Sequence, residues 1–121
     1  MSRRNQSDQI FYFGRTGFTA AGNQGAAPAI DPTLDEVVTA VLTANATVAA
    51  PAASTPGAVN IGSRFYLVVI QDATGTRTLA WNAAWRNAPA MTAGTANQRA
   101  SFEFRWDGVS WQFVGGSTAF A

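Results

Sequence analysis

The feature that most constrains the fold is an alternation of large apolar and polar residues over residues 101–114. The alternation continues on both sides of Asp107 and Gly108. Asp-Gly is a favoured central pair of a type I′ turn, in which both residues need φ > 0. The segment therefore predicts a β-hairpin with a two-residue turn. The predicted cross-strand pairs are Trp106 with Val109, Phe104 with Trp111, and Phe102 with Phe113.

Directly opposed residues of a hairpin point to the same face of the sheet. The six apolar residues should therefore share one face, and the polar residues of the segment should occupy the other. A slip of one residue would mix the two faces, so the pattern specifies the register. A hairpin with one apolar face needs a second layer, or another chain, to cover it.

The rest of the chain after residue 43 reads as short strands and turns. Residues 64–71 are the strongest strand signal, since they are apolar on both faces, and we expect them to lie centrally in a sheet. The other expected elements are a strand at 43–50 ended by Pro51, a loop at 52–57, a short edge element at 59–62, a turn at 72–75, a strand at 76–81 returning antiparallel to 64–71, and an irregular stretch at 82–97.

Residues 31–45 carry two conflicting signals. Thr33 and Glu36 have the spacing of a helix capping box, and apolar residues recur at helical spacing from Leu34 to Leu42. Valine and threonine, however, favour strands. We expect a short helix or turn near 33–36 that runs into a strand.

The N-terminal residues 1–31 are predicted to form an extended arm, followed by a domain at residues 32–121. The stretch at 20–29 has almost no large side chain, so it cannot offset its own ordering entropy. The aromatic residues before it are costly to leave in water. We expect four of them to dock on a neighbouring subunit, on the capsid or on the edge of the domain, namely Phe11, Tyr12, Phe13 and Phe18.

Composition excludes several classes of protein. Charged residues make up 12% of the chain and the net charge is +1, so there is no basic field on the scale that nucleic-acid binding needs. Cysteine and histidine are absent, which removes disulfides, a Ser-His-Asp triad and the commonest metal ligands. We expect no metal, no cofactor and no membrane partner. The first residues lack the apolar core of a signal peptide, so we expect synthesis in a cytoplasm.

No catalytic residue is predicted. The seven carboxylates show no pairing of the kind that a glycosidase needs, and Asp72 and Asp107 fit turn positions. Trp85 lies next to Arg86 in the irregular stretch, and of the four tryptophans it is the one expected to be exposed. Trp85 and Arg86 are therefore the candidate ligand-contact residues.

Three segments of the C-terminal half carry a resemblance. They are residues 62–72 (GSRFYLVVIQD), 78–86 (TLAWNAAWR) and 102–113 (FEFRWDGVSWQF). This pattern, ending in an aromatic hairpin around Asp-Gly, resembles a module of tailed-phage virion proteins. The resemblance covers about residues 58–115. It implies a small β-sandwich, often trimeric, of the kind found in tail fibres, spikes and head decoration proteins.

Together these observations predict an all-β protein: an antiparallel, jelly-roll-like β-sandwich with an extended N-terminal arm. The sequence has no fibre shaft, collagen repeat or coiled-coil heptads. The expected function is therefore that of a head decoration (cement) protein, a trimer that binds the major capsid protein on the capsid exterior of the virion. The alternative is a tail-fibre or head-fibre module that binds a host-surface glycan or receptor. A small hydrolase is disfavoured.

Overall fold

A computed structural model describes residues 18–32, 37–51 and 60–121 of the chain. Within these ranges all regular structure is strand, and no helix long and apolar enough to cross a membrane occurs in them. The strands are β1 (Phe18–Gln24), β2 (Val37–Leu42), β3 (Ala46–Val48), β4 (Arg64–Gln71), β5 (Leu79–Trp81), β6 (Trp85–Arg86), β7 (Arg99–Trp106) and β8 (Trp111–Gly116).

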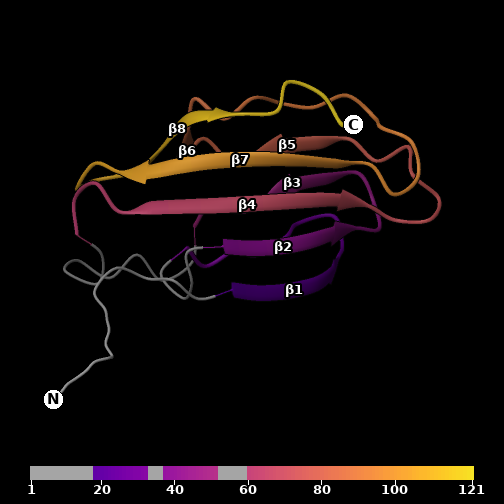
Figure 1. Cartoon of the computed structure of the whole chain (residues 1–121), viewed down its shortest axis with the longest axis horizontal. Coiled ribbons are helices and arrows are strands. Elements are labelled where there is room, and N and C mark those ends of the chain that lie inside the picture. Colours follow the sequence, from indigo (N-terminus) through magenta and orange to yellow (C-terminus); the bar gives the residue numbers. More distant parts are fainter. Residues whose placement is uncertain (1–17, 33–36, 52–59) are drawn as a thin grey trace, which may run out of the picture.

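Six of the strands form one mixed sheet in the order β1-β2-β4-β7-β8-β6 (Figure 1). The pairs β1–β2, β2–β4 and β6–β8 are parallel, while β4–β7 and β7–β8 are antiparallel. The strand at 64–71 lies inside this sheet, as its two apolar faces predict. β3 and β5 form a separate two-stranded parallel sheet.

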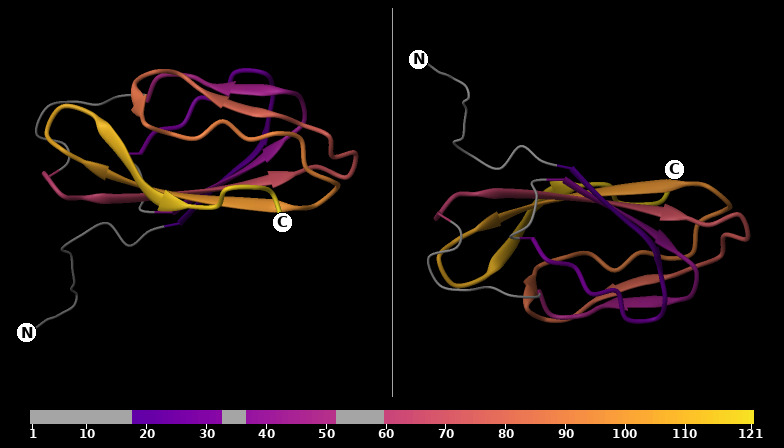
Figure 2. Two further views of the ribbon diagram at one scale, coloured as in Figure 1. Left: turned by 90° about the horizontal axis from the view of Figure 1, so that it is seen from above. Right: turned by 90° about the horizontal axis from the view of Figure 1, so that it is seen from below.

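The small sheet covers one face of the large one (Figure 2). One cluster of buried side chains joins the two layers: Val48 and Leu79 come from the small sheet, and Leu67, Phe104 and Trp111 from the large one. The all-β class is therefore confirmed, but the sheets are mixed and not purely antiparallel. Because the second layer has only two strands, the sandwich and jelly-roll parts of the prediction are not confirmed.

The strand predicted to return along 64–71 instead crosses to the other layer. β5 pairs in parallel with β3, so the expected antiparallel pairing of 76–81 with 64–71 is wrong. The buried side chain of Gln71 accepts a hydrogen bond from the Arg77 N–H at 3.0 Å and donates one to the Arg77 carbonyl at 2.7 Å. These two bonds hold the chain beyond the turn away from β4, where a hairpin ladder would otherwise begin.

Other local predictions meet mixed outcomes. Residues 37–42 are a strand, as expected, and the strand predicted at 43–50 is shorter, at Ala46–Val48. Residues 60–62 form a turn and not an edge strand, with the Ser63 N–H donating to the Asn60 carbonyl at 3.0 Å. The expected helix or turn at 33–36 lies outside the described residues.

The predicted arm overlaps the sheet. β1 pairs with β2 from Phe18 to Gln24, and Ile30 is buried in the core cluster. Residues 18–31 are thus part of the folded domain, so the boundary predicted at residue 31 falls inside it. Phe11, Tyr12 and Phe13 lie outside the described residues, and Phe18 begins β1. Their contact with another subunit or the capsid remains a prediction.

From Phe104 to Trp106 the C-terminal hairpin has a register two residues away from the predicted one, and a β-bulge between Glu103 and Phe104 then pairs Phe102 with Gly116. Trp106 pairs with Trp111 and Phe104 with Phe113, so residues 107–110 make a four-residue loop. Gly108 has the expected positive φ, at 96°, but Asp107 does not, so the turn is not type I′. A shift of two residues keeps every side chain on its face.

The shared apolar face is therefore confirmed for five of the six residues. Phe102, Phe104 and Trp111 are fully buried, and Trp106 and Phe113 pack against the core cluster. Val109 is the exception: it lies in the loop and is 85% exposed.

Candidate functional site

A surface hollow with a volume of about 550 Å³ lies beside the turn of the β7–β8 hairpin. We call it the hairpin hollow. Its walls come from three segments far apart in sequence: the residues just after β3, the β5–β6 connection with the last residue of β6, and the hairpin. The lining residues are Ala50, Pro51, Ala83, Ala84, Arg86, Trp106, Val109, Ser110 and Trp111.

The pairing of β6 with β8 brings two of these walls together. Trp85 pairs with Trp111 and Arg86 with Gln112 in parallel register. Because neighbouring strands lie about 4.8 Å apart, this pairing sets Arg86 beside the hairpin although more than 20 residues separate them in sequence. Figure 1 shows β6 next to β8 at the edge of the sheet.

Two tryptophans form the aromatic part of the hairpin hollow. Trp111 is fully buried, and its ring centroid lies 5.4 Å from that of Trp106 at an interplanar angle of 49°. Trp106 is only half-buried, because it is the last residue of β7 and has the loop, not a further strand residue, beyond it. A buried ring thus supports a partly exposed one that can contact a ligand.

The hairpin loop is held by the Asp107 carboxylate. One of its oxygens accepts hydrogen bonds from the N–H groups of Ser110, at 2.6 Å, and Val109, at 2.8 Å. The other accepts from the Gln112 amide at 2.9 Å and the Ser110 hydroxyl at 3.2 Å. These bonds, led by the one from the Ser110 N–H, lower the pKa of Asp107 to about 2.

The Asp107 carboxylate is thus ionised near neutral pH and engaged at both oxygens. It is poorly suited to act as a general base, because a base needs a pKa near the working pH and a free lone pair. Its role in the structure is to fix the loop that carries Val109 and Ser110.

A series of side-chain hydrogen bonds links the hairpin loop to the residue after β6. The Gln112 amide nitrogen also contacts the Ser110 hydroxyl at 3.2 Å, and its amide oxygen accepts from the Asn87 amide at 3.3 Å. Asn87 directly follows Arg86 and has a φ of 63°. The residue after Arg86 is therefore linked to the same loop.

The two sequence-predicted ligand-contact residues have different outcomes. Arg86 is exposed and lines the hairpin hollow. Trp85 is only 2% exposed, so its predicted exposure is wrong. Its indole N–H donates to the Ala49 carbonyl at 2.8 Å, and its ring lies 4.9 Å from Phe104, centroid to centroid.

Sequence reasoning missed Trp106 and Ser110. It assigned Trp106 to the buried face of the hairpin from its alternation, and it placed Ser110 on the polar face. The available signal was the position of Trp106 at the end of the alternating run, next to the Asp-Gly turn, where the ladder stops covering it.

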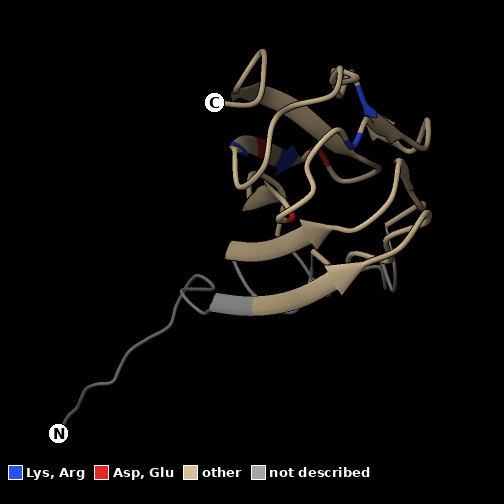
Figure 3. Ribbon diagram, turned by 90° about the vertical axis from the view of Figure 1, so that its right-hand side faces the viewer, with Lys and Arg blue, Asp and Glu red and all other residues tan. Residues whose placement is uncertain are grey.

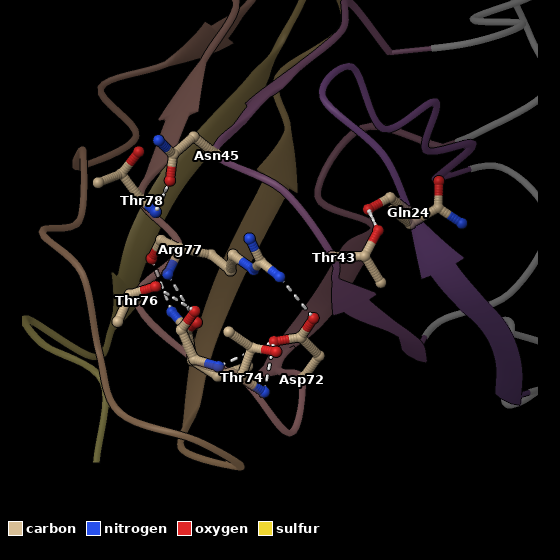
Figure 4. Close-up of polar contacts among 10 residues, drawn as sticks. Gln24, Thr43, Asn45, Asp72, Thr74, Thr76, Arg77 and Thr78 are labelled. Atoms are coloured by element: carbon tan, nitrogen blue, oxygen red, sulfur yellow. Dashed lines mark hydrogen bonds and ion pairs between the residues drawn. The ribbon is translucent and has the colours of Figure 1, made fainter.

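A second polar cluster lies at the opposite end of the strands, around the turn after β4. The Asp72 carboxylate accepts from the Arg77 guanidinium at 3.0 Å, and from the N–H groups of Gly75 at 2.9 Å and Thr74 at 3.2 Å (Figure 4). The bond from Arg77 is the main cause that lowers the pKa of Asp72. The cluster holds a turn, which is the role predicted for Asp72.

Charged groups are few, as Figure 3 shows on the ribbon. No group of three or more potential metal ligands occurs among residues 18–32, 37–51 and 60–121. The described part of the chain has an aromatic hollow, lined by Trp106 and Trp111, with the charged side chain of Arg86 in its wall. These features define a small all-β domain with an aromatic hollow at a hairpin turn.

A family comparison agrees with this class. Residues 26–111, which are 86 of the 121, match the family described as "Putative phage tail fibre C-terminal domain", and the chain belongs to that family. No curated protein and no solved structure matches the chain. The resemblance to a tailed-phage virion module is confirmed, and the protein is a structural component of a phage virion.

The match is to a tail-fibre family, so it does not support the expectation of a head decoration protein on the capsid exterior. The tail-fibre alternative fits better. The trimeric state and the major capsid protein as a partner remain predictions.

Proposed function

We propose that this chain is a tail-fibre domain that binds a glycan on the host cell surface through the hairpin hollow. The observation that carries the proposal is the half-buried Trp106 ring, which lies in a hollow of about 550 Å³ and is supported by the buried Trp111. That volume is within the range of small-ligand sites.

The walls of the hairpin hollow fit a sugar better than an apolar ligand. An exposed aromatic ring offers an apolar face to the C–H groups of a sugar ring, and Arg86 and Ser110 offer polar groups for its hydroxyls. Alanines and a proline make up much of the remaining wall, and these small or rigid side chains have little rotamer entropy to lose on binding. The Asp107 bonds fix the loop in advance, which reduces the ordering cost further.

We infer binding without turnover. Both oxygens of the Asp107 carboxylate are engaged, and none of the described residues that line the hairpin hollow is an aspartate or glutamate. The expected role is adhesion of the virion to its host, with the glycan released unchanged.

The test is to screen the purified full chain against a panel of bacterial surface polysaccharides and to measure the affinity of those bound by calorimetry. Trp106→Ala should weaken binding at least about 30-fold, which corresponds to about 2 kcal/mol for an aromatic contact at the centre of a site. Ala84→Trp should also abolish binding, because it fills the hollow from an exposed position without touching the core.

Tyr66→Ala is the matched control. Tyr66 lines a smaller hollow of about 230 Å³ on the other face of the sheet, next to Glu103 and the two glycines at the end of β8. Tyr66→Ala should leave the affinity for the polysaccharide unchanged. If neither Trp106→Ala nor Ala84→Trp alters binding while Tyr66→Ala does, the site has been misplaced.

A further inference from the structure

We propose that the glycan bound in the hairpin hollow is acidic, with a carboxylate or phosphate group that pairs with Arg86. This inference rests on the proposed function and specifies the class of saccharide that the site takes.

The first argument is the charge of the lining. Among the nine residues that line the hairpin hollow, Arg86 is the one charged residue. The others are apolar, apart from the Ser110 hydroxyl, so the site has an excess positive charge. A cation beside low-dielectric walls attracts an anionic group more strongly than it would in open water.

The second argument is that the Arg86 side chain has no partner among the described residues. Arg77 forms an ion pair with Asp72 at 3.0 Å, and Arg64 and Arg105 both approach Glu103, at 3.9 and 3.7 Å. Within the described ranges, by contrast, no hydrogen bond or ion pair involves the Arg86 guanidinium. Its five N–H donors face water or a ligand.

The third argument concerns Asp107, the acidic residue of the adjacent loop. Each of its carboxylate oxygens already accepts two hydrogen bonds from Val109, Ser110 and Gln112. Turning it toward Arg86 would break the contacts that hold the loop. The Arg86 guanidinium is therefore available to a ligand, although the Asp107 carboxylate lies in the adjacent β7–β8 loop.

Arginine suits this task because its planar fork can form two parallel hydrogen bonds with a carboxylate or phosphate. A sugar hydroxyl would accept a single, weaker bond. Uronic acids and phosphorylated sugars both supply the required planar or tetrahedral anion, and the experiment distinguishes between them.

The test compares matched pairs of ligands. Polysaccharides bound by the wild-type chain are measured before and after their carboxyl groups are reduced to alcohols, and before and after their phosphate groups are removed. Loss of the recognised anion should weaken binding by about tenfold to a hundredfold, the usual worth of a hydrogen bond to a charged group. The treatment that causes the loss identifies the anion.

Arg86→Gln should lower the affinity for the native polysaccharide by the same factor and abolish the difference between native and treated forms. Arg86→Lys, which keeps the charge but not the fork, should retain part of the preference. Arg99→Gln is the control, because it removes the same charge from an exposed position on β7 that lines neither hollow. It should leave the preference unchanged.

The outcomes separate the two proposals. If the wild-type chain binds native and treated forms equally, or if Arg99→Gln and Arg86→Gln weaken binding equally, the acidic ligand is refuted while the glycan site stands. If no polysaccharide binds in any form, the proposed function itself fails.

Discussion

Two glycines with positive φ provide a quantitative test of how the turns of this domain are held. Gly75 has a φ of 72°, and a Cβ added there would lie 2.5 Å from the Ala96 nitrogen and 2.7 Å from the Thr95 carbonyl carbon. Gly108 has a φ of 96°, and its added Cβ would meet only the side chain of Ile61, at 3.2 Å. Both glycines have a positive φ, but an added Cβ would meet backbone atoms at Gly75 and a side chain at Gly108.

Replacing either glycine by alanine adds strain of about 1 to 2 kcal/mol, because L-residues disfavour the left-handed region. At Gly108 the cost should end there, since the exposed Ile61 side chain can move aside. At Gly75 the backbone of Ala96 must shift by most of an ångström. That movement would also weaken the hydrogen bond of 2.8 Å from the Thr76 N–H to the Gly94 carbonyl, worth about 1 kcal/mol.

We therefore expect Gly75→Ala to destabilise the fold by about 2 to 3 kcal/mol and Gly108→Ala by about 1 to 2. At roughly 3 to 5 °C per kcal/mol for a chain of this size, the melting temperature should fall by about 6 to 15 °C for the first and by about 3 to 10 °C for the second. Differential scanning calorimetry measures both. Equal decreases for the two variants would refute the argument that backbone contact at Ala96 sets the difference.

Three further predictions concern single side chains. Gln71→Leu should destabilise by about 2 to 4 kcal/mol in urea unfolding, because it leaves both backbone groups of Arg77 without their partner in a buried setting; a loss as small as that of an exposed residue would contradict this. Trp111→Ala should cost about 3 to 5 kcal/mol as a fully buried aromatic, and Trp106→Ala clearly less; the reverse order would contradict the assigned burial. The Asp107 carboxylate has a pKa lowered from 3.8 to about 2, so its contribution is present above about pH 4 and lost as the pH falls towards 2; Asp107→Asn should flatten the stability profile in that window, and an unchanged profile would rule this out.

The elements that were predictable are those with a regular period. Residues 64–71 and the hairpin carry alternating or continuous apolar patterns, which depend on the local geometry of a strand. The predicted faces of the hairpin are correct although its predicted register is wrong. Between Phe104 and Trp106 the register error is two residues, and an even shift leaves each side chain on the same face. The loop length was not predictable, since the bonds of Asp107 to Val109 and Ser110 favour a four-residue loop over the tight turn that Asp-Gly suggests.

The parts that failed depend on tertiary contacts. The pairing of β5 with β3 and the hydrogen bonds between Gln71 and Arg77 join residues that lie apart in the sequence, and no local sequence pattern predicts them. Trp85 lies in a stretch without periodicity, so only the packing against Phe104 and the bond to Ala49 show that it is buried. Arg86 was predicted as a ligand-contact residue from its place beside Trp85, but the hollow that it lines forms only because β6 pairs with β8.

The hairpin hollow is walled mainly by turns and strand ends, and this has a consequence for how binding can change. Residues such as Ala83, Ala84 and Val109 are exposed and outside the strands, so substitutions there leave the packed layers intact. The two tryptophans of the hairpin hollow belong to the strands, whereas these wall residues do not. Substitutions at the wall can therefore change ligand selectivity without lowering the stability of the fold. Under the proposed glycan-binding function, a phage carrying this domain could shift to a new host polysaccharide through a few surface substitutions, and a designer could do the same by randomising those three positions.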